Sequence, residues 1–317
     1  MPNNASALVA YGSYTSDGNA RTLEIPPGVD HFILRNRSDW GDTTAVTNVQ
    51  SEYQRGQADA SAQGLTQAVT TNILSSSNVT TNGFTLIDSS SDTQLGGALT
   101  LTDITNAAPP VASIADTSSL ANGDIVRIYN SATAKQIAGY DFSIDNIVTN
   151  TSFELIYMTA PGSAGGATSA KRLAFDLNWY PRRRFITGVT TGTTTEVQLS
   201  VTHDFVVGSK VSFRVPSAYG MTQLNNLTGQ VTAINTTTNT ITVDINSSAF
   251  TAFAFPSSAT AAAGVTPAHV VPVGEVSTIL TSASRSAAFR GIRIGSNVCG
   301  PNAAVMDWWA FKADVNI

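Results

Sequence analysis

A short stretch of sequence occurs twice in this chain, and it constrains the fold more than any other feature. Residues 120–128 align without gaps on residues 205–213. In each copy an apolar residue stands three positions before a glycine, a valine stands three positions after it, and another apolar residue stands five positions after it. Internal similarity of this kind indicates two copies of one supersecondary unit.

The similarity continues downstream of this stretch. The corresponding segments there are 139–147 with 229–234, and 153–155 with 241–243. Both copies alternate apolar with polar residues between turn residues, which indicates strand, glycine turn, strand, loop, strand, turn and strand. A few short strands bury little unless they curl into a compact barrel or pack on a neighbour. We therefore expect two small tandem β-barrels, over residues 76–160 and 185–255.

The composition favours strands over helices. Only 12% of the 317 residues are charged, which is about half of the ~25% typical of globular proteins. Few Lys, Glu and Arg are therefore available for helix surfaces, whereas the frequent Thr, Val and Ile fit the pleated surface of a sheet. The net charge of −5 is small and aliphatic residues are spread throughout, so the chain is expected to fold. The predicted fold class is all-β.

The two ends of the chain share the alternating pattern of strands. Residues 7–36 contain strand-like runs separated by turns, and similar runs return near the end of the chain. These later runs cover 276–280, 288–294 and 304–312. Because chain ends commonly lie close together at a domain surface, we expect residues 1–75 and 264–317 to pair into one β-sandwich, with the barrels inserted between them. Residues 161–184 are interpreted as a linker with a basic segment.

The distribution of charge indicates contacts with other subunits. No basic residue lies between Arg55 and Arg127, although a free monomer needs charged side chains over its surface to stay soluble. We interpret this gap as surface that meets other subunits. The single cysteine, Cys299, has no partner for an internal disulfide, so stability is expected to come from packing or assembly.

The sequence shows neither a secretion signal nor a membrane span. Residues 1–14 carry no basic region and no apolar run of the kind found in signal peptides. No stretch approaches the ~20 apolar residues that a membrane-spanning helix needs. We therefore expect a soluble protein that is made in the cytosol and has no membrane partner.

One element of the second copy resembles a known protein family. The residues at 220–225 read Gly-Met-x-x-Leu-Asn; they follow Gly-x-x-Val at 208–211 and precede a strand-like run at 241–243. This arrangement is similar to the first catalytic cysteine half-domain of ubiquitin-activating enzymes, which is a small β-barrel. Barrels with the same similarity occur in structural proteins of tailed bacteriophages, and residues 11–15 and 25–30 of this chain also resemble those proteins.

The resemblance implies a structural protein of a phage particle rather than an enzyme that activates ubiquitin. No glycine-rich loop follows a strand and opens a helix, so adenylation has no nucleotide site. Cys299 also lies outside the segment that matches the half-domain. A tail or neck component is the first expectation, and a capsid decoration protein is the alternative.

No catalytic or metal site is expected. His31, His203 and His269 are far apart in the sequence, and none has a second ligand at the spacing of a metal site. The Gly-x-Ser-x-Gly pattern of a serine nucleophile does not occur, and Cys299 is interpreted as a small packed residue rather than a thiolate. We therefore expect a protein that is not an enzyme and needs no cofactor.

Two clusters of residues are candidates for an interface. Arg182, Arg183 and Arg184 concentrate positive charge, which suits either phosphate contacts with DNA or ion pairs with acidic residues of a neighbouring subunit. The negative net charge favours the second interpretation. Trp308 and Trp309 are adjacent, and adjacent residues of a strand face opposite sides, so only one ring can enter the core. The other is the interface candidate.

The sequence therefore predicts a non-enzymatic virion protein, made in the host cytoplasm, that assembles as a homo-oligomer and with other virion proteins. The terminal sandwich is expected to anchor the subunit in a symmetric array, in which many modest contacts together supply the affinity. The alternative from a different class is a carbohydrate-binding module that recognises a host glycan. Exposed aromatic residues such as Trp179 or Trp309 would then line a shallow sugar site.

Overall fold

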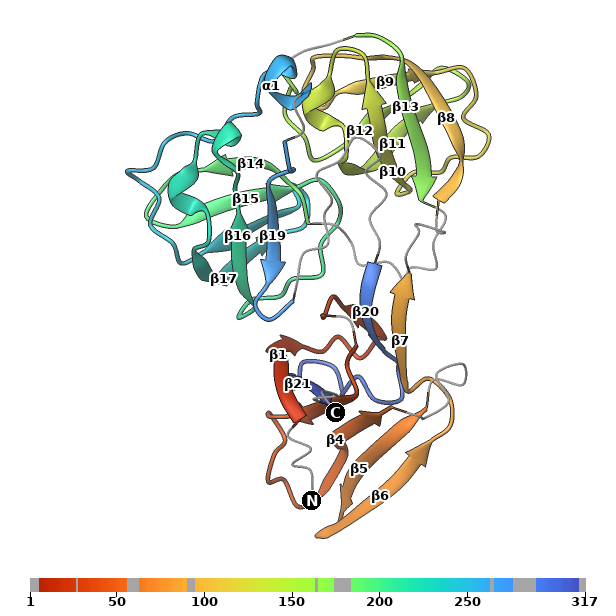
Figure 1. The fold of residues 1–317 in the computed structure, drawn as a ribbon, viewed down its shortest axis with the longest axis vertical. Helices are drawn as coiled ribbons and strands as arrows, with labels where there is room; N and C mark the ends of the chain where they lie inside the picture. The colour runs from red at the N-terminus through yellow and green to blue at the C-terminus, as the bar shows by residue number, and fades with distance from the viewer. Residues whose placement is uncertain are drawn as a thin grey trace.

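The computed structural model describes residues 6–26, 28–55, 63–89, 95–162, 165–173, 184–262, 265–275 and 289–313. Nearly all of their regular elements are strands, which confirms the prediction of an all-β protein. Their helical elements are α1 (Ser258–Ala262) and the 3-10 turns η2 (Lys135–Ile137), η3 (Ser217–Tyr219) and η4 (Thr222–Leu224). Figure 1 shows a base that contains the strands from both ends of the chain, with two curled units above it.

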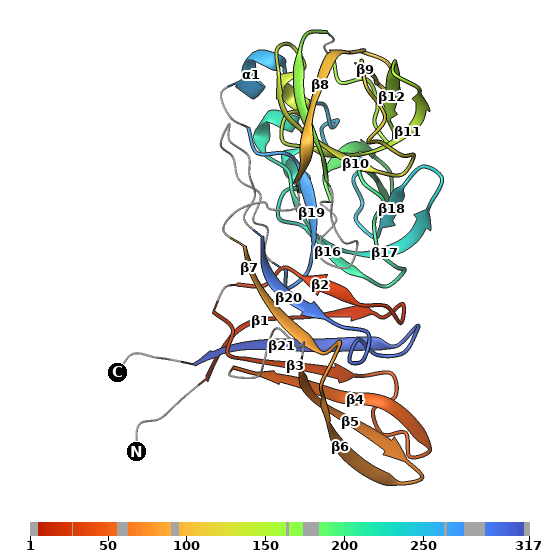
Figure 2. The ribbon, with the colours of Figure 1, turned by 90° about the vertical axis from the view of Figure 1, so that its right-hand side faces the viewer.

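The base joins strands from both ends of the chain into two antiparallel sheets. The larger sheet has the strand order β1-β21-β3-β4-β5-β6, and the smaller sheet has the order β2-β20-β7. The larger sheet consists of β1 (Ser6–Thr15), β21 (Val305–Ala313), β3 (His31–Asn36), β4 (Ala45–Gln54), β5 (Gly64–Thr70) and β6 (Ile73–Val79). The smaller sheet consists of β2 (Arg21–Leu23), β20 (Phe289–Ile294) and β7 (Phe84–Ser89). The last strand, β21, therefore lies between two strands of the N-terminal segment (Figure 2).

One hydrophobic core fills the space between these two sheets. Inward and outward positions alternate along β3, and Phe32 and Leu34 are fully buried. Trp308 of β21 stacks on Phe32 with ring centroids 6.0 Å apart, and Phe84 of the smaller sheet lies 5.6 Å from the same ring. Burial of each such side chain stabilises the fold by roughly 1.5–3 kcal/mol. The base is thus held together by contacts between residues that are distant in the sequence.

The first curled unit is a closed six-stranded barrel with the strand order β10-β11-β12-β9-β8-β13. Its strands are β8 (Leu95–Ile104), β9 (Val111–Ile114), β10 (Ile125–Ser131), β11 (Asp141–Val148), β12 (Ser152–Leu155) and β13 (Thr168–Leu173). Large apolar side chains fill the interior, among them Leu101, Ile128, Phe142 and Phe153, all fully buried. A small barrel of this kind leaves no room for a ligand in its interior.

The second curled unit repeats the strand order of the barrel. Its strands are β14 (Ile186–Thr190), β15 (Thr195–Leu199), β16 (Lys210–Arg214), β17 (Thr228–Asn235), β18 (Thr240–Val243) and β19 (His269–Pro272). The two units correspond strand by strand: β16 to β10, β17 to β11, β18 to β12, β15 to β9, β14 to β8 and β19 to β13. The end strands meet at a single bridge between Phe185 and His269, whereas β8 and β13 pair along several residues. We call this unit the curled sheet.

The glycines at the centre of the repeated stretch have the same conformation. Gly123 has a φ of 90° and Gly208 a φ of 93°. The N–H of Gly123 donates to the carbonyl oxygen of Ile144, and the N–H of Gly208 donates to that of Val231, both at 2.8 Å. The two turns therefore connect their strands with the same hydrogen bond, as the similarity of the two stretches predicts.

The downstream alignment needs one correction. Gly139 corresponds to Asn226 rather than to Gly229, because both residues have a positive φ. Their N–H groups donate to the carbonyl oxygens of Ile128 and Phe213, which are equivalent in the two copies. Asparagine adopts this left-handed conformation more readily than other non-glycine residues. A match of glycine to glycine is consequently misleading at this turn.

Two boundaries differ from the ranges expected from the sequence. Strand β7 pairs with β20 in the base, so the closed barrel occupies 95–173 instead of 76–160. Strand β19 pairs with β16 in the curled sheet, so the C-terminal part of the base begins after β19 rather than at residue 264. The alternation of apolar residues identifies a strand, but it does not reveal which sheet the strand joins.

Replacement of Gly208 by alanine is expected to lower the free energy of unfolding by about 1–2 kcal/mol, because a side chain disfavours its positive φ. The nearest atom to an added Cβ is Nε2 of Gln230 at 3.8 Å, so no steric clash adds to this cost. Urea denaturation followed by circular dichroism measures the change. Gly188→Ala, in β14 and without a positive φ, is the control, and its expected effect is within about 0.5 kcal/mol. Equal decreases in the free energy of unfolding of the two variants would show that the positive φ of Gly208 is not what makes alanine unfavourable there.

Candidate functional site

Arg184 lies at the junction between the base and the curled sheet. Its guanidinium forms ion pairs with Asp204 at 3.1 Å and with Glu275 at 3.7 Å, and its side chain is only 8% exposed. Arg21 of β2, in the base, contacts the same Asp204 at 3.6 Å. This network joins the two parts of the molecule through charged groups.

The prediction that Arg184 contributes to an interface between subunits is corrected by this geometry. The acidic partners of Arg184 belong to its own chain, and its buried guanidinium is not presented to DNA or to a neighbouring protein. Sequence spacing does not reveal these partners, since Asp204 and Glu275 are brought to it only by the fold. Arg182 and Arg183 lie outside the described residues, as does Trp179.

Glu275 is the most strongly buried carboxylate of the junction. Its side chain is 4% exposed, and one of its oxygens accepts the backbone N–H of Glu24 at 3.1 Å. Burial raises the pKa of Glu275 to about 7, against the attraction of Arg184, and the negative charge of Glu24 adds to the increase. Removal of a carboxylate from water disfavours its charged form in this way. The junction therefore contains a carboxyl group that titrates near neutral pH.

The base and the curled sheet also approach each other closely at two glycines. A Cβ added at Gly274 would lie 2.0 Å from the carbonyl oxygen of Tyr11, and one added at Gly12 would lie 2.6 Å from that of Val273. Only glycine permits such an approach of the two backbones. The curled sheet is thus seated directly on β1.

Trp308 and Trp309 occupy opposite faces of the larger sheet, as the alternation along a strand predicts. Trp308 is 1% exposed and belongs to the core, so Trp309 is the ring of the pair that stays an interface candidate. Trp309 faces outward, where the guanidinium of Arg35 lies 5.3 Å from its ring and 4.3 Å from the ring of Trp40. Trp40 is 53% exposed. This outer face therefore presents aromatic surface to solvent.

Both edge strands of the larger sheet expose apolar side chains. On β1, Leu8 is 49% and Tyr11 62% exposed; on β6, Ile73 is 67% and Leu74 59% exposed. Among the residues that the structure describes, no strand pairs with the outer edge of β1 or of β6. Natural proteins usually protect such edges with lysine, proline or a bulge. Strand β6 contains neither lysine nor proline, so its backbone is open to pairing.

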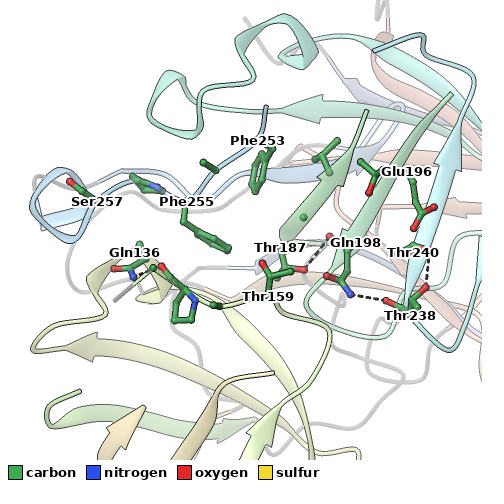
Figure 3. Close-up of a pocket in the computed structure, with 18 of the residues that line it drawn as sticks. Gln136, Thr159, Thr187, Glu196, Gln198, Thr238, Thr240, Phe253, Phe255 and Ser257 are labelled. Carbon is green, nitrogen blue, oxygen red and sulfur yellow. Dashed lines mark hydrogen bonds between the residues drawn. The ribbon is translucent and has the colours of Figure 1, made fainter. Parts of the chain in front are cut away.

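A cleft with a volume of about 700 Å³ lies between the barrel and the curled sheet. Strands β14, β15 and β18 form its floor, the segment 253–258 forms one wall, and the barrel loop 159–162 forms the other (Figure 3). Alternate residues of a strand face opposite sides. Val197 of β15 therefore enters the core, whereas its neighbours Glu196 and Gln198 face the cleft.

Hydrogen bonds hold the polar side chains of the cleft floor in place. The side-chain amide of Gln198 donates to the carbonyl oxygen of Thr238 at 3.2 Å, and the hydroxyl of Thr187 donates to that of Tyr157 at 2.6 Å. The hydroxyls of Thr238 and Thr240 form a hydrogen bond at 3.1 Å, in which either hydroxyl can be the donor. Apart from the carboxylate of Glu196, the floor thus consists of neutral polar groups that hydrogen bonds within the protein hold in place.

Aromatic side chains fix the two units to each other at the edge of this cleft. The hydroxyl of Tyr140, in the barrel, donates to the hydroxyl of Tyr219, in the curled sheet, at 3.0 Å. The ring of Phe255 lies 5.9 Å from Tyr140 and 6.1 Å from Tyr219, and Phe253 stacks on Tyr219 at 5.4 Å. Phe253 and Phe255 are both half-buried, so part of each ring faces the cleft.

Sequence reasoning did not identify the cleft, because its residues come from segments that no motif connects. The alternation of β15 shows that Glu196 and Gln198 point away from a core, but it does not show what they face. The remaining lining residues belong to connecting segments such as 159–162 and 253–258. Connecting segments lack the periodic pattern from which a partner surface can be inferred.

The groups considered for catalysis lie apart from the cleft. Cys299 is 1% exposed within the core of the base, and burial raises the pKa of its thiol. Within the described part of the chain, no three His, Cys, Asp or Glu side chains come together in a group that could hold a metal ion. No described helix is long and apolar enough to cross a membrane.

Two comparisons of the sequence with known proteins give no match. No family model matches the chain, and no curated protein shows significant sequence similarity to it. A functional assignment consequently rests on the residues, on their arrangement and on the resemblance of residues 220–225 and of the N-terminal segment described above.

Replacement of Glu275 by glutamine is expected to change how stability depends on pH. The pKa of Glu275 is raised to about 7 in the folded protein from an ordinary value of 4.5. The unfolded chain therefore ionises first, and the wild type loses stability as the pH rises from about 4.5 to about 7. Glu275→Gln removes this loss, so the variant should match the wild type near pH 4 and exceed it by about 1–3 kcal/mol at pH 8.

Urea denaturation at a series of pH values measures this difference. Glu154→Gln, on the barrel and away from the junction, serves as the control and should follow the wild-type curve. Parallel curves for Glu275→Gln and the wild type would show that Glu275 does not carry the expected penalty.

Proposed function

We propose that the chain is a non-enzymatic structural component of a tailed bacteriophage virion, in the tail or neck, and that it assembles with copies of itself and with other virion proteins. The phage context comes from the resemblance of residues 220–225, 11–15 and 25–30. The role in assembly comes from the surface of the base. On this proposal the protein is made in the host cytoplasm and resides in the virion.

The observation that carries the proposal is the pair of open edges on the larger sheet. Ile73 on β6 is 67% and Leu8 on β1 is 49% exposed, and no described strand pairs with either edge. The close contacts of the curled sheet with β1 are at Tyr11 and Gly12, beyond Leu8. An exposed edge strand is a template for pairing with another chain. If β1 of one copy pairs with β6 of the next, both backbones gain hydrogen bonds and these apolar side chains leave water.

The geometry of the edges determines what kind of assembly follows. Strands β1 and β6 are the opposite edges of one sheet, so their pairing between copies is a head-to-tail contact. Such contacts generate a closed ring where the rotation closes and an open helical tube where it does not. Rings and tubes are the architectures of necks and tails. Trp309 and Trp40 on the outer face of the same sheet offer further aromatic surface to neighbouring proteins.

We interpret the base as a β-sandwich that anchors the subunit, and the two curled units as tandem barrels inserted into it. The second barrel is less completely closed than the first. Both units lie at the end of the molecule opposite β6 (Figure 1). In an array formed through the base, they project outward or pack against their counterparts in adjacent subunits.

Self-association is expected to disappear when charge is placed on the edge of β6. Sedimentation velocity from nanomolar to micromolar concentration should show discrete oligomers of the 33.1 kDa chain. The double variant Ile73→Lys and Leu74→Lys should raise the midpoint concentration by about tenfold or more, which corresponds to at least about 1.4 kcal/mol per contact.

A matched control comes from the barrel. Val148 is 54% exposed on β11, and Val148→Lys makes the same kind of change away from the base, so association should be unaffected. A strict monomer at all concentrations would contradict self-assembly and favour a decoration protein that needs a preformed particle. Equal weakening by Val148→Lys would show that the edge of β6 is not the interface.

A further inference from the structure

The cleft between the barrel and the curled sheet has the dimensions of a ligand site and no part in the proposed assembly. Its volume of about 700 Å³ falls within the range of roughly 300–1,000 Å³ that is usual for small-molecule sites. Strands β14 and β15, which contribute to its floor, lie in the upper part of the molecule, whereas β6 lies at the far end of the base (Figure 1). A ligand could therefore reach the cleft in an assembled array.

The cleft is preformed rather than created by a moving segment. The hydrogen bond between Tyr140 and Tyr219 and the ring of Phe255 join the cores of the two units beside it. On the opposite side, the hydroxyl of Thr187 donates to the carbonyl oxygen of Tyr157 and ties β14 to the barrel. A site whose walls are held in this way loses little entropy when a ligand binds.

The charge of the lining determines the class of ligand. Among the described residues that line the cleft, none is Lys, Arg or His, and the one ionisable side chain is the carboxylate of Glu196. Phosphate and sulfate groups are bound by cationic side chains, so nucleic acids and anionic glycans lack their usual partners here. An apolar helix requires a hydrophobic groove, and this floor presents the half-buried Gln198 and the exposed Thr190 and Thr238.

The polar groups of the floor match the hydroxyls of a neutral sugar. Threonine hydroxyls and glutamine amides both donate and accept hydrogen bonds, as sugar hydroxyls do, and an ionised carboxylate accepts from two donors. Glu196 is exposed at the floor, next to Gln198 on the same face of β15. The half-buried rings of Phe253 and Phe255 supply an apolar surface against which the C–H face of a sugar ring can pack.

We propose that this cleft binds a neutral oligosaccharide, with Glu196 and Gln198 as hydrogen-bonding partners and Phe253 and Phe255 as the apolar wall. The site is independent of the assembly proposed above, since it uses none of the residues of the β1 and β6 edges. The preference for neutral ligands distinguishes the cleft from the surface around Trp309, because the cation of Arg35 lies beside that ring.

A glycan array that carries neutral, sialylated and sulfated oligosaccharides tests the ligand class. The wild-type protein should bind neutral glycans, and its binding should not require an acidic group on the glycan. Isothermal titration calorimetry with the neutral oligosaccharide that binds most strongly on the array then measures affinity for the wild type and variants. Absence of binding to every neutral glycan, or binding to acidic glycans alone, would overturn the proposal.

The site is tested by a variant that fills the cleft without disturbing the backbone. A Cβ at Gly188 would contact only the side chain of Gln198, at 3.5 Å, which is an ordinary van der Waals distance. Gly188→Leu should therefore fold normally, place its side chain over the floor and weaken binding at least about tenfold. Sedimentation velocity should show unchanged self-association, which separates this result from a failure of assembly.

A second pair of variants removes a hydrogen-bonding group instead. Gln198→Ala should also weaken binding about tenfold. Gln223→Ala makes the same change at an exposed position outside the cleft and should bind as the wild type does. Unchanged affinity in both Gly188→Leu and Gln198→Ala, with circular dichroism showing folded proteins, would place any glycan site elsewhere on the molecule.

Discussion

The whole structure depends on the position of the last strand. Strand β21 lies between β1 and β3, and its Trp308 stacks on Phe32 in the centre of the core. The N-terminal segment alone therefore has neither a continuous sheet nor a filled core. Because β7 and β20 also pair with each other, the chain leaves and re-enters the base through adjacent strands. Everything between them is an insertion whose presence does not interrupt the base.

The insertion is held on the base by charge and by close packing of backbone. Arg184, Asp204 and Glu275 come from the inserted part, and Arg21 comes from the base. Since the cost of removing charges from water largely offsets their attraction, we interpret this network as fixing orientation more than adding stability. The close contact at Gly274 also fixes the orientation of the insertion, because any larger residue would push the curled sheet away from β1.

The sequence allowed the strands, the repeat and the alternation to be predicted, but not the partners of individual residues. The repeat at Gly123 and Gly208 could be predicted from the sequence because a positive φ restricts the residue type at both turns. The ion pairs of Arg184 and the lining of the cleft were not readable, since both are created when distant segments meet. The turn at Asn226 was misaligned because two residue types satisfy the same backbone requirement. Periodicity encodes local structure and burial, whereas long-range pairing leaves no local signal.

We propose that copies of the base assemble and leave the inserted units exposed. Electron microscopy of the purified protein, at a concentration where it self-associates, tests this arrangement. We expect rings or tubes in which neighbouring subunits touch through β1 and β6 of their bases, with the barrel and the curled sheet projecting from the wall. Single-chain particles at every concentration, or an array joined through the inserted units, would contradict it.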